Sequence, residues 1–272
     1  MSLLDLSAAF DTVDHGILLH RLNHSFGITD SALKWFKSYL TNRSFRVVIR
    51  DALSDTFGLV CSVPQGSKLG PRLYSQYTRF LGLLLRVLLM CFHCYADDTQ
   101  LQKSFNPRHT PTQITTKQQI EDGIMEVARA LNANKLKLNK EKTEFLIVLG
   151  KRYENMVQID SLQLGNDVVM RTPTARNLGV IIDSHLSLEQ QVNDVRRKCY
   201  YYLKWIKDIR PYISAYVAKV LVQALVISRL DYCNALYIGL PKYLLQRLQA
   251  VQNAAARVIT KCARDDSISE AC

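Results

Sequence analysis

Hydrophobic positions in the first two-thirds of the chain fall into short apolar runs and longer segments with helical spacing. Apolar or alternating runs predict strands over residues 3–6, 45–50, 57–63, 87–94, 99–102, 136–139, 145–149, 162–170 and 178–182. Apolar residues three and four positions apart predict helices over residues 14–22, 28–40, 72–85 and 116–131. Strands and helices therefore mix up to about residue 185.

The rest of the chain carries only the helical spacing. Three apolar faces predict three helices, and Pro211 and Pro241 separate them. The faces are Val192, Val195, Cys199, Leu203 and Ile206; Val217, Val220, Leu221, Ala224 and Leu225; and Leu244, Leu248, Val251, Ala255 and Val258. The pattern thus predicts a strand-and-helix part over residues 1–185, a helical part over residues 186–264 and a polar tail over residues 265–272.

Composition places the chain among globular proteins, with 48% hydrophobic and 22% charged residues in 272. The longest apolar run, residues 80–92, is interrupted by Arg86 and is too short to span a bilayer. The first residues lack the basic region of a secretory signal, and seven irregularly spaced cysteines suggest reduced thiols. We therefore expect a nuclear or cytoplasmic protein that is neither secreted nor attached to a membrane.

The net charge of +11 is concentrated near the C-terminus. Residues 196–264 hold 13 Lys and Arg against two acids, whereas residues 1–195 hold 22 Lys and Arg against 19 acids. A concentrated basic segment indicates a polyanionic partner, most often a nucleic acid. The alternative is a solvated basic helical face with no partner.

The tetrapeptide Tyr95-Ala96-Asp97-Asp98 joins two predicted strands, and so predicts a β-hairpin with two carboxylates at its tip. Adjacent acids beside apolar strands repel each other, and a hard divalent cation such as Mg²⁺ would relieve that repulsion. The alternative is an ordinary solvated turn. A further acid, Asp5, ends the first predicted strand, and an aromatic residue, Phe10, follows it by five positions. Such a pair could hold a metal and place a ring beside a bound sugar, or it could be a helix cap and a core residue.

Five short motifs occur in order along the chain. They are Asp5-Leu-Ser-Ala-Ala-Phe10-Asp11, Ser62-Val-Pro-Gln-Gly-Ser-Lys-Leu-Gly-Pro71, Tyr95-Ala-Asp-Asp98, Leu138-Asn-Lys-Glu-Lys-Thr143 and Asn177-Leu-Gly-Val180. In this order they resemble palm motifs A to E of the reverse transcriptases of non-LTR (LINE-type) retrotransposons. The resemblance covers nearly the whole chain. It implies an α+β fold, with a polymerase palm built on an antiparallel sheet packed by helices and a basic helical region similar to the family's thumb.

The resemblance also implies roles in RNA-directed DNA synthesis. Asp5 and Asp97, assisted by Asp98, would bind two Mg²⁺ ions, or Mn²⁺ in their place. Phe10 stands where the family excludes a ribose 2′-hydroxyl. Lys142 is similar to a motif D lysine, which would act on pyrophosphate as a general acid or through its charge alone.

Other positions would contact the substrates, namely the RNA template, the DNA primer and the dNTPs. Gln65 and Gly66 would shape the nucleotide pocket, and Leu178 and Gly179 would belong to the primer grip. The candidates for contacts with the nucleic-acid backbone are Arg196, Arg197, Lys198, Lys204 and Lys207.

The chain departs from the family pattern in several places. It begins four residues before Asp5, so we expect the fingers to be absent, and a partner would have to supply them. Lys68, Arg72 and Gln76 stand in a segment around motif B that is usually more apolar. Two further hypotheses therefore stay open: a catalytically inert, truncated remnant that at most binds nucleic acid, and a palm polymerase of another kind, which Phe10 disfavours.

Overall fold

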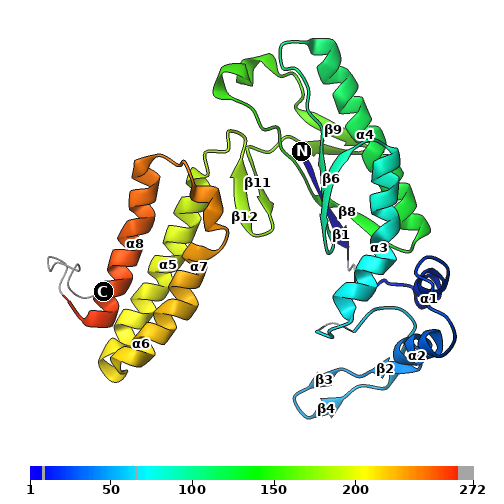
Figure 1. Cartoon of the computed structure of the whole chain (residues 1–272), viewed down its shortest axis with the longest axis horizontal. Helices are drawn as coiled ribbons and strands as arrows, with labels where there is room; N and C mark the ends of the chain where they lie inside the picture. The colour runs from blue at the N-terminus through cyan, green and yellow to red at the C-terminus, as the bar shows by residue number, and fades with distance from the viewer. Residues whose placement is uncertain (8–9, 65, 263–272) are drawn as a thin grey trace. The chain divides into compact units, whose positions relative to one another are not determined.

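The computed structural model describes residues 1–7, 10–64 and 66–262 (Figure 1). Contacts divide the chain into an N-terminal unit, residues 1–172, and a C-terminal unit, residues 173–272. The boundary lies before the hairpin of residues 174–183, which the sequence pattern grouped with the preceding strands. That hairpin belongs to the C-terminal unit.

An antiparallel sheet of four strands forms the centre of the N-terminal unit. In order across the sheet the strands are β6 (Cys91–Tyr95), β7 (Asp98–Gln102), β1 (Ser2–Ser7) and β8 (Lys137–Phe145). Alternate residues of β1, namely Ser2, Leu4 and Leu6, are buried, because the side chains of a strand point to opposite faces in turn. The predicted α+β fold with an antiparallel sheet is confirmed.

Two long helices, α3 (Gly70–Val87) and α4 (Thr110–Ala133), lie beside this sheet (Figure 1). Their buried side chains share one core with β1, and include Tyr74, Leu81, Leu85, Ile120, Ile124 and Val127. The predicted start of α4 at Thr116 was wrong. His109 caps the helix by accepting a hydrogen bond from the Thr112 N–H at 3.3 Å, and proline is well tolerated in a first turn.

The first helical hairpin follows the prediction closely. Its helices are α1 (His15–His24) and α2 (Asp30–Leu40). The carboxylate of Asp14 accepts a hydrogen bond from the Ile17 N–H at 2.9 Å, so it is the N-cap of α1. The guanidinium of Arg21 donates to the carbonyl of Tyr77 and to the side chain of Asn134, which ties α1 to α3 and to the end of α4.

The predicted pairing of residues 45–50 with 57–63 is correct only at one end. β2 (Arg43–Phe45) pairs with β5 (Phe57–Leu59), but β3 (Val48–Ile49) folds back on β4 (Ala52–Leu53). Arg50 has a positive φ of 54°, which reverses the chain between β3 and β4. The side chains of this double hairpin are largely exposed.

Strand β8 is continuous where the pattern predicted two strands around a turn. Leu3 pairs with Glu144 but Asp5 pairs with Asn139, so residues 140–143 bulge out opposite Leu4. Downstream, the single strand predicted over residues 162–170 is a hairpin of β9 (Ser161–Leu164) and β10 (Asp167–Met170). A 3₁₀ helix, Lys151–Met156, precedes that hairpin.

The C-terminal unit begins with a hairpin and continues as helices. The hairpin is β11 (Thr174–Asn177) and β12 (Val180–Asp183). The helices are α5 (Glu189–Ile209), α6 (Ala215–Val222), a π-helical turn (Gln223–Ile227), α7 (Ser228–Asp231) and α8 (Lys242–Thr260), with 3₁₀ turns at Arg210–Tyr212 and Asn234–Tyr237. The three predicted helices are confirmed. Helices α5, α6 and α8 lie side by side (Figure 1) around a core that includes Leu203, Val226 and Val251.

Asp183 joins the β12 strand to helix α5. Its carboxylate accepts hydrogen bonds from the N–H groups of His185, Ser187 and Leu188, at 2.7 to 3.0 Å, and from the Ser187 hydroxyl at 3.1 Å. Burial alone would raise the pKa of Asp183, but these hydrogen bonds outweigh burial and lower it. The loop that leads into α5 is therefore fixed by a charged group.

No helix in the described part of the chain combines the length and the apolarity that a bilayer span requires.

Candidate functional site

Three carboxylates lie at one end of the central sheet. Asp5 is on β1, Asp98 begins β7, and Asp97 is in the two-residue turn between β6 and β7. Leu4 pairs with Thr99, so the antiparallel register carries Asp5 and Asp98 to neighbouring positions. Ala96 allows the tight turn by adopting a positive φ of 52°. Segments that are distant in sequence thus meet at their acidic residues.

The neighbouring acids influence the ionisation of Asp98. Burial raises the pKa of Asp98 first, and the negative charges of Asp97 and then Asp5 raise it further. A cation is the simplest partner that would remove this repulsion, and carboxylate oxygens are the ligands that hard divalent cations prefer.

A lysine from the β8 bulge reaches the same place. The Nζ atom of Lys142 lies 3.7 Å from Oδ2 of Asp5. Asn139 supports the bulge, because its side-chain oxygen accepts from the Lys142 N–H at 3.3 Å and its carbonyl accepts from the Thr143 hydroxyl at 2.9 Å. The bulge therefore places Lys142 within ion-pair distance of Asp5.

The donors fit a hard metal ion by type but are not gathered around one point. Asp5, Asp97 and Asp98 supply only oxygen ligands. Within the described residues, no three His, Cys, Asp or Glu side chains converge closely enough to hold a metal ion. In this state Asp5 is paired with Lys142 instead.

Phe10 packs on a residue that the sequence analysis did not single out. Its ring stacks on that of Tyr74, with 4.5 Å between ring centroids and 23° between ring planes. Tyr74 is completely buried, and its hydroxyl has no hydrogen-bond partner among the described residues. Burial, followed by the charges of Asp97, Cys94 and Tyr77, raises the pKa of Tyr74. Tyr74 thus contacts Phe10 and feels the charge of Asp97. In the sequence, the only sign of such a role was a tyrosine hydroxyl at an apolar position of α3.

The loop before α3 is closed by a serine that the sequence analysis also passed over. The Ser67 hydroxyl donates to the carbonyl of Pro64 at 2.7 Å and accepts from the Gly70 N–H at 2.9 Å. Gly66 has a φ of 75°, and nothing lies within 4 Å of where a β-carbon would stand. Gln65 lies outside the described residues. The Ser67 hydroxyl therefore links Pro64 to Gly70, and the space beside Gly66 is open.

Leu178 and Gly179, expected to open a strand, form the turn between β11 and β12 with φ values of 45° and 82°. The hydroxyl of Tyr232 donates to the Leu178 carbonyl at 2.6 Å, and its ring lies 3.6 Å from the position of a β-carbon on Gly179. A glycine is favoured here by its positive φ, whereas the ring lies at an ordinary van der Waals distance that a β-carbon could accept.

The five predicted backbone-binding cations on α5 fall into different settings. Arg197 and Lys198 form ion pairs with Asp194 at 2.9 and 2.7 Å, and Arg196 lies over the ring of Tyr200. Lys204 and Lys207 instead line a groove between α5 and α8. The structure therefore separates cations that contact Asp194 or an aromatic ring from cations that face a groove.

Comparisons with known proteins agree on one family. The reverse transcriptase (RNA-dependent DNA polymerase) family matches residues 1–182. A probable RNA-directed DNA polymerase from transposon X-element of Drosophila melanogaster is 27% identical over 273 residues, and one from transposon BS of the same species is 25% identical over 267. Each alignment covers 95% of this chain and 28% of the relative, so the chain spans little more than a quarter of their length.

Among solved structures, telomerase from Candida albicans in complex with a fragment of telomeric RNA matches with a TM-score of 0.44 and 12% identity. That match covers 96% of this chain and 43% of the other. The family match extends over the three acids, the glycine loop and the β11–β12 hairpin. The chain belongs to the reverse transcriptase (RNA-dependent DNA polymerase) family.

Proposed function

We propose that this chain is the catalytic part of an RNA-directed DNA polymerase that uses two metal ions. The observation that carries the proposal is the meeting of Asp5, Asp97 and Asp98 at one sheet end, with Lys142 beside them. Reverse transcriptases as a family use divalent metal ions, and we infer Mg²⁺ here, with Mn²⁺ as a substitute, because every nearby acidic donor is an oxygen.

The three acids would have different roles in metal binding. Asp5 and Asp97 would hold the ions, with Asp98 assisting. When bound, such ions activate the primer 3′-hydroxyl and stabilise the leaving pyrophosphate. Lys142 would leave Asp5 and bind the pyrophosphate. There it would act as a proton donor or through its positive charge. Its distance of 3.7 Å from Asp5 supports a place within reach of the reacting groups.

Selectivity for dNTPs over ribonucleotides would come from Phe10. The stack on the buried Tyr74 holds the Phe10 ring in one position, so it could exclude a 2′-hydroxyl by contact. Gln65 and Gly66 would shape the nucleotide pocket, and the open space around Gly66 supports a close approach by a ligand.

The remaining parts would hold the template–primer duplex. Residues 1–185 would act as the palm and residues 186–264 as the thumb, with Leu178 and Gly179 in the primer grip. Cations of α5 would contact the phosphate backbone without reading sequence. A nuclear or cytoplasmic location would give access to RNA and dNTPs.

A second candidate function is nucleic-acid binding without polymerisation. Two observations favour it: the acids do not converge on one point within the described residues, and a cationic groove lies in the C-terminal unit. This function would not depend on Asp5 or Asp97.

Primer extension separates the two candidates. The full chain is incubated with a DNA primer annealed to an RNA template, dNTPs and Mg²⁺, beside Asp97→Asn and a control, Asp51→Asn, in the exposed turn between β3 and β4. Polymerase function predicts extension by the wild type and the control and none by Asp97→Asn. Binding of the duplex without extension by any variant would reject the polymerase and leave the second candidate.

A further inference from the structure

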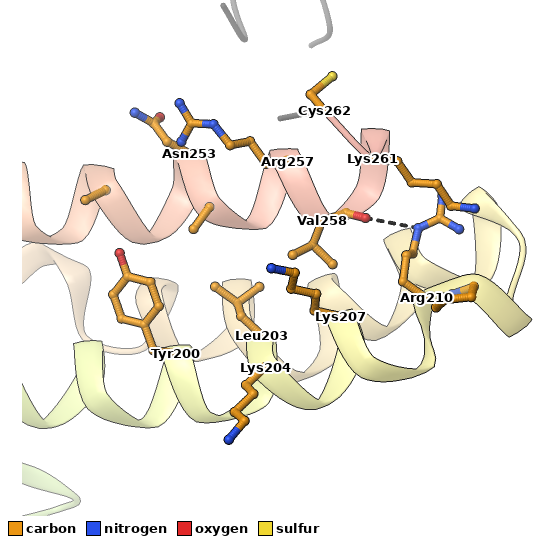
Figure 2. Close-up of a pocket in the computed structure, with 13 residues that line it drawn as sticks. Tyr200, Leu203, Lys204, Lys207, Arg210, Asn253, Arg257, Val258, Lys261 and Cys262 are labelled. Carbon is orange, nitrogen blue, oxygen red and sulfur yellow. Dashed lines mark hydrogen bonds between the residues drawn. The ribbon is translucent and has the colours of Figure 1, made fainter. Parts of the chain in front are cut away.

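A groove of about 890 Å³ runs between α5 and α8 in the C-terminal unit. Figure 2 shows Tyr200 and Lys207 pointing from α5 toward α8, while Lys204 turns outward at the edge. Leu203 and Val258 give it an apolar floor. Its volume is that of a ligand site of about 300–1,000 Å³.

The groove is cationic, and no acidic side chain balances its charge among the described residues. Lys204, Lys207, Arg210, Arg257 and Lys261 line it, and no acid does so among the described residues. None of these five forms an ion pair with a described residue, in contrast to Arg197 and Lys198, which share Asp194. Like charges that gather without counter-charges repel each other, so an anionic ligand would stabilise this end of the helices.

Two arginines of the groove have buried guanidinium atoms. Arg210 is buried, and its guanidinium donates to the carbonyls of Val258, Ile259 and Ile213 at 2.8 to 3.0 Å, which fixes its charge at the end of α8. The Nε atom of Arg257 is buried, with no hydrogen-bond partner in the described part of the chain. A buried donor without a partner is costly, and the rest of the Arg257 side chain lines the groove.

We propose that this groove binds a single strand of nucleic acid, with bases toward the apolar floor and phosphates toward the cations. The inference rests on the proposed nucleic-acid function and names a second mode of binding within it. A duplex keeps its bases stacked inside and offers only phosphates and groove edges to such a surface. A single strand can also place a base against Leu203, Val258 and the partly exposed ring of Tyr200, and base–aromatic stacking is the usual basis of such binding.

Fluorescence anisotropy on the full chain tests the assignment. The probes are a labelled single-stranded oligonucleotide, a duplex of the same sequence, and unlabelled tripolyphosphate as competitor. The variants are Lys207→Gln with Arg257→Gln, and separately Tyr200→Leu, with Lys219→Gln on α6 as an exposed cation outside the groove. Thermal melting verifies that each variant is folded.

We expect the double variant to bind the single strand on the order of tenfold more weakly, and its salt slope to fall by about 1.4, which is two phosphate contacts at about 0.7 each. Tyr200→Leu should weaken single-strand binding at least about fivefold and leave duplex binding nearly unchanged. Lys219→Gln should match the wild type.

Equal losses for single strand and duplex would overturn the single-strand assignment in favour of a general backbone contact. Full competition by tripolyphosphate, with no effect of Tyr200→Leu, would overturn it in favour of a compact phosphate ligand. Unchanged binding in the double variant would remove the groove from nucleic-acid recognition. Because the readout is binding, the result is independent of primer extension and separates failure of this inference from failure of the polymerase proposal.

Discussion

Replacing Asp98 with asparagine should stabilise the metal-free protein while weakening its response to Mg²⁺. Asp98 stands beside two other carboxylates, and its pKa is raised by burial and then by the charges of Asp97 and Asp5. Lys142 is paired with Asp5 rather than with Asp98. Asparagine keeps the shape of the side chain and removes the charge, so the repulsion with both neighbours disappears.

The size of the effect follows from the setting. Asp98 is exposed as a residue although its carboxyl group is partly desolvated, and screened charge pairs at exposed positions are worth about 0.2–1 kcal/mol each. Two neighbours therefore give a gain in the free energy of unfolding of about 1 kcal/mol. For a unit of this size, 1 kcal/mol raises Tm by about 2–4 °C. Because the folded-state pKa is raised, the penalty in the wild type is fully present above that pKa and vanishes as pH falls below the unfolded value.

Thermal melting in EDTA measures the stability of the metal-free protein, and melting in Mg²⁺ measures its stabilisation by the ion. In EDTA, Asp98→Asn should melt above the wild type, and Asp51→Asn should not. Mg²⁺ at ten times its Kd should stabilise the wild type by about 1.4 kcal/mol, and the variant by less. Destabilisation by Asp98→Asn in EDTA, or an Mg²⁺ shift as large as in the wild type, would refute the reasoning that these acids form one cation site.

Three further outcomes follow from single side chains. Tyr74→Phe removes a buried hydroxyl without a described partner, so urea unfolding should show equal stability or a gain of about 1 kcal/mol, and a clear loss would mean that the hydroxyl is bonded. Asp183→Asn should lower stability by about 2–4 kcal/mol at pH 7. Because folding lowers the pKa of Asp183, the stability difference between wild type and variant should be fully present above the pKa of the unfolded state. It should disappear as pH falls through the pKa of the folded state, and a stability difference that does not depend on pH would contradict this reasoning. Phe10→Ala should raise ribonucleotide use relative to dNTPs by roughly tenfold or more in single-nucleotide incorporation. Unchanged selectivity would mean that Phe10 does not exclude the 2′-hydroxyl.

Local pattern was sufficient wherever the signal lay within one element. The strand that carries Asp5, the helix that begins near Asp14 and the hairpin that ends in Asp97 and Asp98 all depend on neighbouring residues in sequence. The start of α4 was missed because a histidine cap and a proline in the first turn resemble a loop in composition.

The remaining features arise only in three dimensions. The β8 bulge depends on the register with which β8 pairs with β1. The sequence pattern around Lys142 therefore predicts a break between two strands rather than a bulge in one strand. The stack of Phe10 on Tyr74 joins residues on separate elements, and the orphaned Nε of Arg257 is visible only once α5 and α8 are packed. Sequence could supply the candidate acids and cations, but not which of the cations are paired with Asp194.

The most direct test of the central claim is a double-mutant cycle on nucleotide incorporation. Rates are measured on an RNA template with Mg²⁺ for the wild type, Asp5→Asn, Asp97→Asn and the double variant. If both acids serve one metal site, each single change should lower the rate roughly 10³-fold or more, and the double change should cost little beyond either one. Incorporation that survives the double change, or that falls by the product of the two single effects, would contradict a shared site at the end of this sheet.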